Sequence, residues 1–232
     1  MSTLADFRLL VSSVIGMDNS AGSAEQLLID KWCSDAVTHI LVRTKARVLV
    51  GTFNLNAGSK DYDIDTDMLM LLKIVMADGT PCWEVSPERI YDLRASSSSG
   101  FSGSYTYAFD GSNLVMFYPT PGSNDQLTTY FVPRPNRMTT STDDPSLPQW
   151  GGIPTEWHKL IELYALAEAS DYDDDQSAAQ GTRYKQEFEL LLNQFKKANS
   201  RKGGRVMPRF EITPPSLRRG APSSDRSADV VG

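Results

Sequence analysis

The hydrophobic pattern of this 232-residue chain changes period twice, and these changes limit the folds that it can adopt. Apolar residues recur at helical spacing up to residue 47, alternate with a period of two from about residue 52 to residue 135, and return to helical spacing after residue 151. A short helical segment must bury its apolar stripe against another element, and neither end of the chain can do this alone. The pattern therefore predicts an α+β protein, in which the two helical ends form one helical core and an antiparallel β module is inserted between them.

Two amphipathic helices are predicted in residues 1–47, the first part of the helical core. One spans LADFRLLVSSVIG and ends near Gly16, because glycine commonly terminates helices. The other begins at Ser23 and Gln26, which have the spacing of a capping box. Its apolar stripe combines residues four positions apart with their neighbours: Leu28, Trp32, Ala36 and Ile40, widened by Leu27, Ile29, Val37 and Leu41.

The β module is assigned to residues 48–150. Alternating segments flank AGSK, Asp78-Gly79 and Asp110-Gly111, and such turns favour hairpins. DQLTTYFVP supplies a last strand, SPERIYDL predicts one helical turn, and SSSSGFSGS is interpreted as a mobile loop. About six or seven short antiparallel strands are typical of a small sandwich or an open barrel.

A helical hairpin over residues 151–198 completes the predicted core. Pro154 suits a first helical turn, and His158 is placed on the polar side of the first helix. The buried face of that helix is predicted to contain Trp157, Leu160, Ile161, Tyr164 and Ala165. The second helix carries an apolar seam with spacings of four, three and four: Tyr184, Phe188, Leu191 and Phe195.

Several aspartates lie between these two helices: Asp171, Asp173, Asp174 and Asp175. A calcium loop has an alternating D-x-D-x-D-G frame and a distal glutamate, and DYDDDQSAAQG lacks both the glycine and that acid. Aspartate also accepts hydrogen bonds from the free N–H groups at the start of a helix. We therefore interpret these residues as helix punctuation and expect no metal or cofactor.

Catalytic motifs are not visible in the sequence. His39 and His158 have no partner at metal-ligand spacing and no GxSxG motif, and the Gly-containing ADGT and FDGS are hairpin turns, not phosphate loops. Cys33 and Cys82 lack CxxC spacing and are predicted to be buried thiols. A pair of carboxylates for glycoside hydrolysis remains an open alternative, because acidic residues are plentiful and none lies in a recognisable motif. An enzyme is not expected.

Charge divides the chain unevenly. The net charge is −6, but residues 199–232 contain seven basic and three acidic residues, a net of +4, which leaves −10 on the preceding residues. This terminal stretch is rich in Pro, Gly, Ser and Arg, so its ordering entropy is not offset by apolar burial within the chain. It is predicted to be an extended basic tail, disordered alone and ordered by docking on a partner. A nucleic-acid arm is the alternative. The candidate docking residues are Arg201, Lys202, Arg205, Val206, Arg209, Phe210, Leu217, Arg218 and Arg219.

The order of these elements resembles the head-to-tail adaptor proteins of tailed bacteriophages, also called connector or head-completion proteins. The resemblance covers roughly residues 1–198 and includes the capped helix with Trp32, AGSKDYDI, NLVMFYPTPGSNDQLTTYFVPRPNRM and the Tyr184/Phe188 seam. Its most specific motif consists of Ile153, Pro154, Trp157, His158, Leu160, Tyr164 and Ala165. The chain departs from the family pattern in the QWGG insert before this motif and in its longer basic tail.

The resemblance implies a non-enzymatic structural subunit of a phage virion. Such proteins form a ring of about 12 copies beneath the portal, contact the tail or nozzle protein, and line the channel through which DNA leaves. The protein is then made in the bacterial cytoplasm and works at the capsid vertex. A negatively charged body fits this role, because it repels DNA phosphates and lets the genome slide.

A carbohydrate- or receptor-binding virion module built on the β portion is the alternative function. Trp83, Tyr105 and Tyr107 would stack on sugars if exposed, although alternating aromatic residues in short strands are more often core. A cell-wall-degrading enzyme is a third, less favoured interpretation. No membrane association is expected, because no apolar run approaches the roughly 18 residues of a membrane span and MSTLADFRLL lacks the features of a signal peptide.

Overall fold

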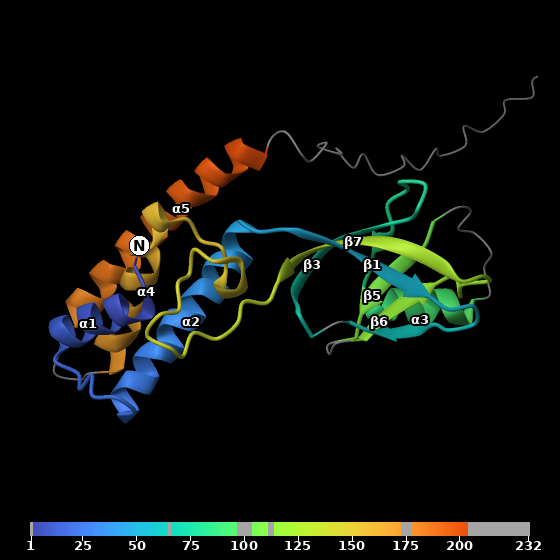
Figure 1. The fold of residues 1–232 in the computed structure, drawn as a ribbon. Helices are drawn as coiled ribbons and strands as arrows, with labels where there is room; N and C mark the ends of the chain where they lie inside the picture. The colour runs from blue at the N-terminus through green and yellow to red at the C-terminus, as the bar shows by residue number, and fades with distance from the viewer. Residues whose placement is uncertain (1, 65, 97–103, 111–113, 173–177, 204–232) are drawn as a thin grey trace, which may run out of the picture.

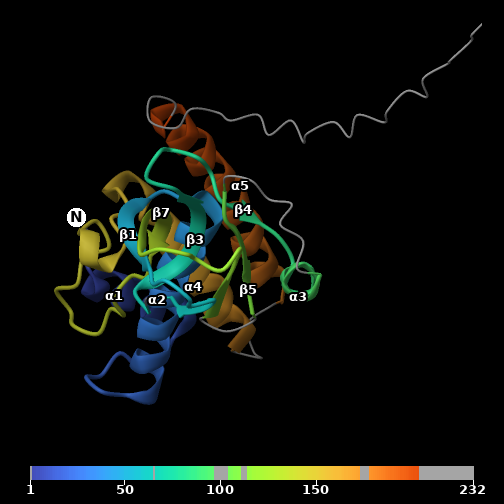
Figure 2. The same ribbon diagram turned by 90° about the vertical axis from the view of Figure 1, so that its right-hand side faces the viewer.

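The computed structural model describes residues 2–64, 66–96, 104–110, 114–172 and 178–203. The molecule is elongated, with its bundle of long helices at one end and its strands at the other (Figure 1). Viewed along the long axis, the β module lies in front of this bundle (Figure 2). This arrangement confirms the predicted α+β fold, with a helical core and an inserted β module.

The helical core is built from both ends of the sequence. Its described helices are α1 (Leu4–Ile15), α2 (Ala24–Thr44), α4 (Lys159–Tyr172) and α5 (Ala178–Gly203). Helix α4 contacts the other three, and two 3₁₀ turns, η1 (Pro148–Trp150) and η2 (Thr155–Trp157), precede it. Helix α5 runs to Gly203, past residue 198, where the sequence had suggested that the helix ends.

The predicted helix boundaries follow from capping. Helix α1 ends at Gly16, whose φ of 84° lies in the left-handed region and whose N–H donates to the Ser12 carbonyl oxygen at 2.8 Å. At the start of α2 the Ser23 hydroxyl accepts a hydrogen bond from the Gln26 N–H at 3.1 Å, as expected. In a capping box the Gln26 side chain would accept a hydrogen bond from the Ser23 N–H. It instead accepts from the N–H of Gly22, one residue earlier, at 2.8 Å.

Apolar side chains of all four helices meet in one cluster, and α4 is its centre. The predicted seam of α5 is in place: Phe188 and Phe195 are buried, and Tyr184 and Leu191 pack at the margin. The predicted stripe of α2 is also buried, except that Leu28 is partly buried and Leu27 is 56% exposed. The cluster extends into the β strands through Leu69, Met70, Leu72 and Val132.

The segment between the last strand and α4 lies against the helices. Met138 is fully buried in the helical cluster, and the Leu4 N–H donates to the Asp143 carbonyl oxygen at 2.9 Å. Gly151, part of QWGG, has a φ of 127°, and a Cβ there would lie 2.5 Å from Cγ1 of Val37. The glycine is therefore required for the chain to pass this close to α2.

Strands form two small sheets. The first has the order β1-β7-β3 and the second the order β2-β6-β5-β4. Their bounds are β1 (Leu49–Leu55), β2 (Asp61–Asp63), β3 (Met68–Val75), β4 (Trp83–Glu84), β5 (Thr106–Phe109), β6 (Leu114–Tyr118) and β7 (Asp125–Pro133). Most of SSSSGFSGS, the predicted mobile loop, lies outside the described residues.

Strand pairing departs from a succession of hairpins. A tight turn does form at AGSK, where the Ser59 N–H donates to the Asn56 carbonyl oxygen at 3.1 Å. However, β1 pairs with β7 and β2 pairs with β6, so this turn carries the chain from one sheet to the other. Strand β4 likewise leaves the turn at Asp78-Gly79 and pairs in parallel with β5, which corrects the expectation that every strand is antiparallel. The predicted hairpin around Asp110-Gly111 is formed by β5 and β6, and at Asp78-Gly79 a short antiparallel bridge joins Val75 and Pro81 before the chain enters β4.

A second apolar cluster fills the space between the two sheets. It contains Leu55, Ile74, Cys82, Tyr105, Tyr107, Val115, Phe117 and Leu127. Ser86 caps helix α3 (Pro87–Ala95), which replaces the single turn predicted at SPERIYDL and packs Ile90 against Ala108 and Met116. Both cysteines are buried, as predicted.

Shortening Phe188 tests the shared helical core. Its side chain is 5% exposed and its ring lies 5.6 Å from that of Tyr164, so Phe188→Ala leaves a cavity between α4 and α5. We expect the free energy of unfolding in urea to fall by about 3–5 kcal/mol. Leu190→Ala on the same helix is the matched control, because Leu190 is 64% exposed and its loss should change stability by less than about 0.5 kcal/mol. Equal effects of the two substitutions would contradict the position of the seam.

Candidate interaction surfaces

The predicted docking residues begin at the end of α5. Arg201 and Lys202 belong to the last turn of this helix, although their side chains are outside the description. The remaining candidates, which are Arg205, Val206, Arg209, Phe210, Leu217, Arg218 and Arg219, lie outside the described residues. Their role as docking residues stays a prediction.

The C-terminal part of α5 is held against the end of α2 and the segment before α4. The Phe195 ring stacks at a tilt on that of Trp157, with centroids 4.9 Å apart. One turn further on, Nδ2 of Asn199 donates to the Thr44 carbonyl oxygen at 3.5 Å. Thr44 is the last residue of α2 and precedes β1 by only a few positions. Asn199 therefore holds α5 beside the junction of the helical core and the β module.

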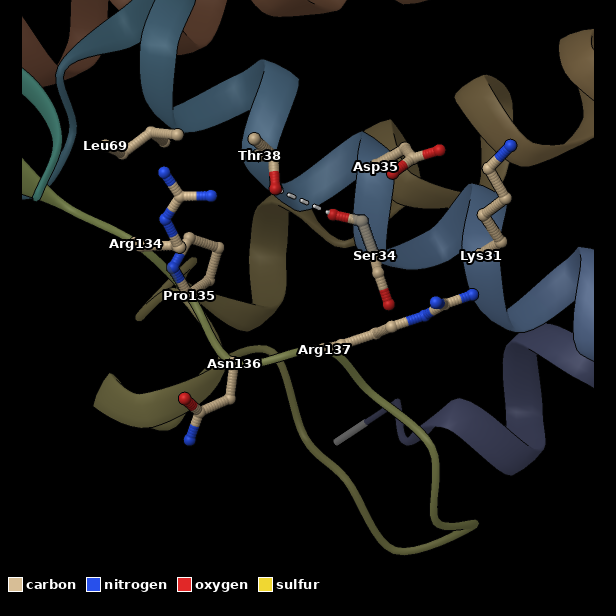
Figure 3. A pocket seen from close by; sticks show the side chains of 9 residues that line it. All are labelled: Lys31, Ser34, Asp35, Thr38, Leu69, Arg134, Pro135, Asn136 and Arg137. Atoms are coloured by element: carbon tan, nitrogen blue, oxygen red, sulfur yellow. Dashed lines mark hydrogen bonds between the residues drawn. The ribbon is translucent and has the colours of Figure 1, made fainter. Parts of the chain in front are cut away.

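A groove lies on the exposed side of α2, between this helix and the segment after β7 (Figure 3). Its volume is about 460 Å³, and its lining comes from Lys31, Ser34, Asp35, Thr38, Leu69, Arg134, Pro135, Asn136 and Arg137. The α2 residues follow one another at helical spacing and so share one face. We call this feature the basic groove.

Positive charge dominates the basic groove. Lys31 and Arg137 take part in none of the ion pairs found within the described residues, and Asp35 is the only carboxylate in the lining. Arg134 is held by a hydrogen bond from Nε to the Thr66 carbonyl oxygen at 2.9 Å. With three cations and one carboxylate in its lining, the groove offers net positive charge to a partner with carboxylate groups. Sequence reasoning missed it, because Lys31 and Arg137 are brought together only by tertiary packing.

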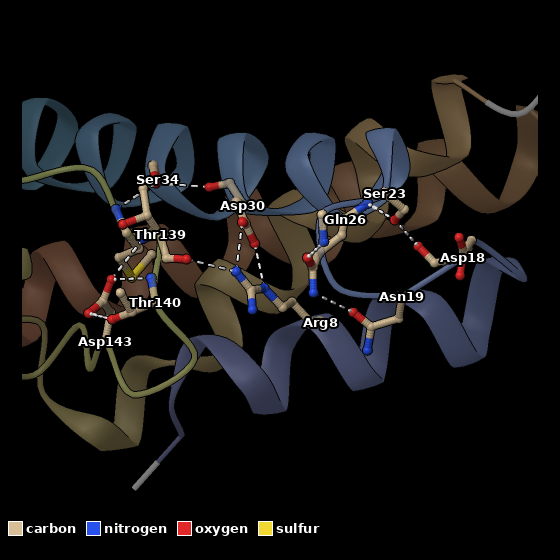
Figure 4. A network of polar contacts seen from close by, with 12 residues as sticks. Arg8, Asp18, Asn19, Ser23, Gln26, Asp30, Ser34, Thr139, Thr140 and Asp143 are labelled. Carbon is tan, nitrogen blue, oxygen red and sulfur yellow. Dashed lines mark hydrogen bonds and ion pairs between the residues drawn. The ribbon is translucent and has the colours of Figure 1, made fainter.

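A polar network holds the far wall of the basic groove in place (Figure 4). Arg8 of α1 donates two hydrogen bonds to the carboxylate of Asp30 of α2, at 2.6 and 2.7 Å, and a third to the Thr139 carbonyl oxygen at 3.0 Å. The hydrogen bond with Asp30 raises the pKa of Arg8 above its usual range. This bidentate pair is largely buried, so it ties two helices and the segment after β7 into one unit.

Asp143 organises the same segment from within. Its carboxylate accepts hydrogen bonds from the backbone N–H groups of Thr139 and Thr140 at 2.7 and 2.8 Å, and also from the Thr140 hydroxyl. Burial alone would raise the pKa of Asp143, but these hydrogen bonds outweigh it and lower the pKa below its usual value. These hydrogen bonds close a turn over residues 139–143. The turn holds the preceding residues, Arg137 and Met138, against α2.

Neither histidine belongs to a catalytic arrangement in the described residues. His158 was expected on the polar side of its helix, and this expectation is wrong: the residue is 2% exposed, lies against the Phe7 ring and donates from Nε2 to the Ile153 carbonyl oxygen at 3.1 Å. His158 lies at the end of a 3₁₀ turn and precedes α4. The α-helical spacing used to place its side chain therefore does not hold at this residue. His39 packs between the rings of Tyr164 and Phe188. Burial lowers the pKa of both imidazoles.

Carboxylates do not assemble into a metal site within the described part of the chain, where no three His, Cys, Asp or Glu residues are placed to hold an ion. Asp171 forms an ion pair with Lys185 across the α4–α5 connection, at 2.6 Å. Asp173, Asp174 and Asp175 fall outside the described residues, so their interpretation as helix punctuation stays a prediction.

The aromatic residues considered for sugar binding are mostly internal. Tyr105 and Tyr107 are buried in the β core, and the Tyr105 hydroxyl donates to the Asp125 carboxylate at 2.5 Å. Burial raises the pKa of both phenols well above the usual range. Trp83 is 38% exposed and stands alone among the three candidates at the surface. These tyrosines therefore cannot form a stacking platform for carbohydrate.

The described residues present two candidate contact surfaces, the end of α5 and the basic groove. Within the described residues, no helix has the length and apolar character needed to cross a membrane. The family model described as SU10 adaptor protein matches residues 2–209, and the chain belongs to this family of phage head–tail adaptors. Membership confirms the resemblance seen in the sequence and implies a non-enzymatic role in a phage virion. A search of curated proteins found no match.

The buried imidazole of His158 predicts a dependence of stability on pH. Because burial lowers its pKa in the folded protein, the unfolded chain binds the proton more readily, and the free energy of unfolding falls as the pH drops below about 6.5. His158→Gln removes this titration and leaves His39 in both proteins. We expect urea unfolding curves between pH 7.5 and 5.5 to show a steeper loss for the unmodified protein than for the variant. Parallel losses would show that His158 does not titrate on unfolding in this range.

Proposed function

We propose that this chain forms a ring beneath the portal of a tailed phage, where it connects the capsid vertex to the tail or nozzle and lines the DNA exit channel. The observation that carries the proposal is the family match, which extends from residue 2 to residue 209 and so includes the helical core, the β module and the end of α5. About 12 copies under cyclic symmetry would form such a ring.

The construction of the molecule supports a connecting role. Leu69, Met70 and Leu72 of β3 pack against the helical core, whereas Leu71 and Ile74 of the same strand pack in the β core. One strand thus belongs to both cores, and β7 does the same through Val132 and Leu127. The two ends of the molecule are held at a fixed separation, as an adaptor between two different proteins requires.

The charge distribution supports a channel. Residues 1–198 carry a net charge of −10, and a ring multiplies this charge by the number of copies. Carboxylates facing the channel repel DNA phosphates, whereas a basic lumen would retain the genome with a strong dependence on salt. The proposed channel therefore lets DNA pass without binding it.

The basic tail is proposed to dock on the portal. Its apolar residues would fill small grooves, and its arginines would pair with carboxylates or carbonyl oxygens at their edges. The proposed contacts are Arg201, Lys202, Arg205, Val206, Arg209, Phe210, Leu217, Arg218 and Arg219. Since α5 ends at Gly203, a cut after this residue removes the tail and leaves every described helix whole.

Deleting residues 204–232 tests this docking. We expect the shortened protein to remain folded, with an unchanged urea midpoint, and to lose stable association with portal rings of the same phage in co-sedimentation and two-dimensional class averages. If the tail were a nucleic-acid arm, the deletion would preserve portal binding and remove a salt-sensitive affinity for DNA. Undiminished association of the shortened protein with the portal would refute the docking role.

The basic groove is proposed to receive carboxylates of the next copy in the ring. A cyclic interface is heterologous, so a surface on one copy meets a different surface on its neighbour, and a cationic groove on an otherwise acidic body is suited to such a contact.

Reversing charge in the groove tests this contact. The double variant Lys31→Glu and Arg137→Glu should fold normally, because both side chains are exposed, and should lower the number of copies bound per portal ring. Arg183→Glu together with Lys196→Glu, on the outer face of α5, makes the same change in net charge away from the groove. An equal loss in both double variants would attribute the effect to net charge, against the proposed contact.

A further inference from the structure

A second hollow lies where α2, α4 and α5 meet. Its volume is about 300 Å³, and its lining consists of His39, Tyr164, Ala167, Glu168, Lys185, Phe188 and Glu189. We call this hollow the aromatic pocket. Viewed along the long axis, α5 and the segment after β7 lie on opposite sides of α2 (Figure 2). The aromatic pocket and the basic groove therefore flank α2 on different sides.

Three rings in mutual contact form one wall of the aromatic pocket. The centroid of the Tyr164 ring lies 5.5 Å from that of His39 and 5.6 Å from that of Phe188, and the last two are 5.8 Å apart. Ala167 also lines the pocket, and its small side chain leaves space beside the rings. Aromatic faces carry negative partial charge, so a wall of this kind attracts cations.

The charged groups at the rim are unequally paired. Arg43 donates from both terminal nitrogens to the carboxylate of Glu189, each at 2.9 Å. Lys185 forms its ion pair with Asp171, outside the lining, at 2.6 Å. Glu168 takes part in none of the ion pairs found within the described residues. The pocket therefore holds one carboxylate that a cation from outside can pair with.

The titration of the lining residues agrees with a negative potential in the pocket. Burial raises the pKa of the Tyr164 phenol, and the charge of Glu168 raises it further. The same carboxylate adds to the raised pKa of Lys185, which is due first to its hydrogen bond with Asp171. Burial lowers the pKa of His39, so its imidazole is neutral near pH 7 and does not repel a cation.

The arrangement suits a guanidinium group. Glu168 follows Tyr164 by four positions on α4, so the carboxylate and the ring lie on the same face of the helix. A planar guanidinium can stack on an aromatic ring and pair with a carboxylate at the same time, whereas an ammonium is a compact and strongly hydrated charge. Arg137, in the basic groove, is exposed and takes part in none of the ion pairs found in the described part of the chain.

We propose that the aromatic pocket of one copy receives the guanidinium of Arg137 from the neighbouring copy in the ring, where it stacks on Tyr164 and pairs with Glu168. The inference rests on the proposed function and deepens it, because it names the carboxylate that enters the basic groove. Groove and pocket flank α2 on different sides, so each copy offers Arg137 to one neighbour and accepts it from the other. A heterologous contact that closes into a ring has this form.

The chemistry of the pocket is tested on the isolated protein with N-acetyl-arginine amide. Of the two histidines only His39 lines the pocket, so its imidazole signals in NMR spectra report binding. We expect a saturable shift with a Kd of about 1–10 mM, as suits so small a ligand, and no shift with the uncharged citrulline analogue. Absence of a saturable shift, or an equal response to the two probes, would overturn the proposal.

Matched variants assign the binding of this probe to the two named groups. Glu168→Gln and Tyr164→Leu should each weaken binding about three- to tenfold, because one removes the charge and the other the ring. Glu156→Gln makes the same change in charge at an exposed residue outside the lining, and Tyr164→Phe keeps the ring, so both should bind as the unmodified protein does. Undiminished binding to Glu168→Gln would contradict the proposed pairing.

A charge exchange identifies the source of the guanidinium. Arg137→Glu and Glu168→Arg should each lower the number of copies bound per portal ring, and their combination should restore it. Glu168→Arg with Arg183→Glu has the same net charge as that combination and should not restore it. Failure of the exchange to restore binding would overturn the assignment to Arg137. If the unmodified protein formed no ring, the proposed function and the neighbour's role would both be refuted, while the arginine probe would still judge the pocket.

Discussion

Helix α4 is surrounded by α1, α2 and α5, and the two ends of the chain meet on it. Leu160, Ile161, Ala165, Leu166 and Ala169 are all buried, on more than one side of the helix. Because burial on several sides requires several partners, α4 cannot be stable in water until the N-terminal helices and α5 are in place. The β module must therefore leave this core and return to it, which makes the paired strands β1, β7 and β3 the physical link between the two parts.

That link has consequences for an adaptor. Strands shared between two apolar clusters transmit force and orientation, since neither cluster can rotate without breaking strand pairing. The segment after β7 adds a second attachment through Met138 and the pair of Arg8 and Asp30. In the proposed adaptor role, a rigid junction would keep the helical core and the β module in a fixed relative orientation.

Interaction surfaces gather where the two parts join. The basic groove and the end of α5 both involve α2, the helix that leads into the first strand. The cations of the groove gain charge-assisted contacts when a partner with carboxylate groups covers them. Their positions are consistent with the proposed assembly on a portal.

Local pattern determined much of this protein. Periodicity located the helices and most strands, Ser23 and Gly16 set helix ends, and the α5 seam and the buried cysteines followed from spacing and composition. The tertiary structure alone decided which strands pair, because periodicity tells which face is buried but not what lies across from it. The burial of His158 and the meeting of Lys31 with Arg137 were likewise decided by long-range packing, which draws residues distant in sequence together and follows from the closure of the whole core.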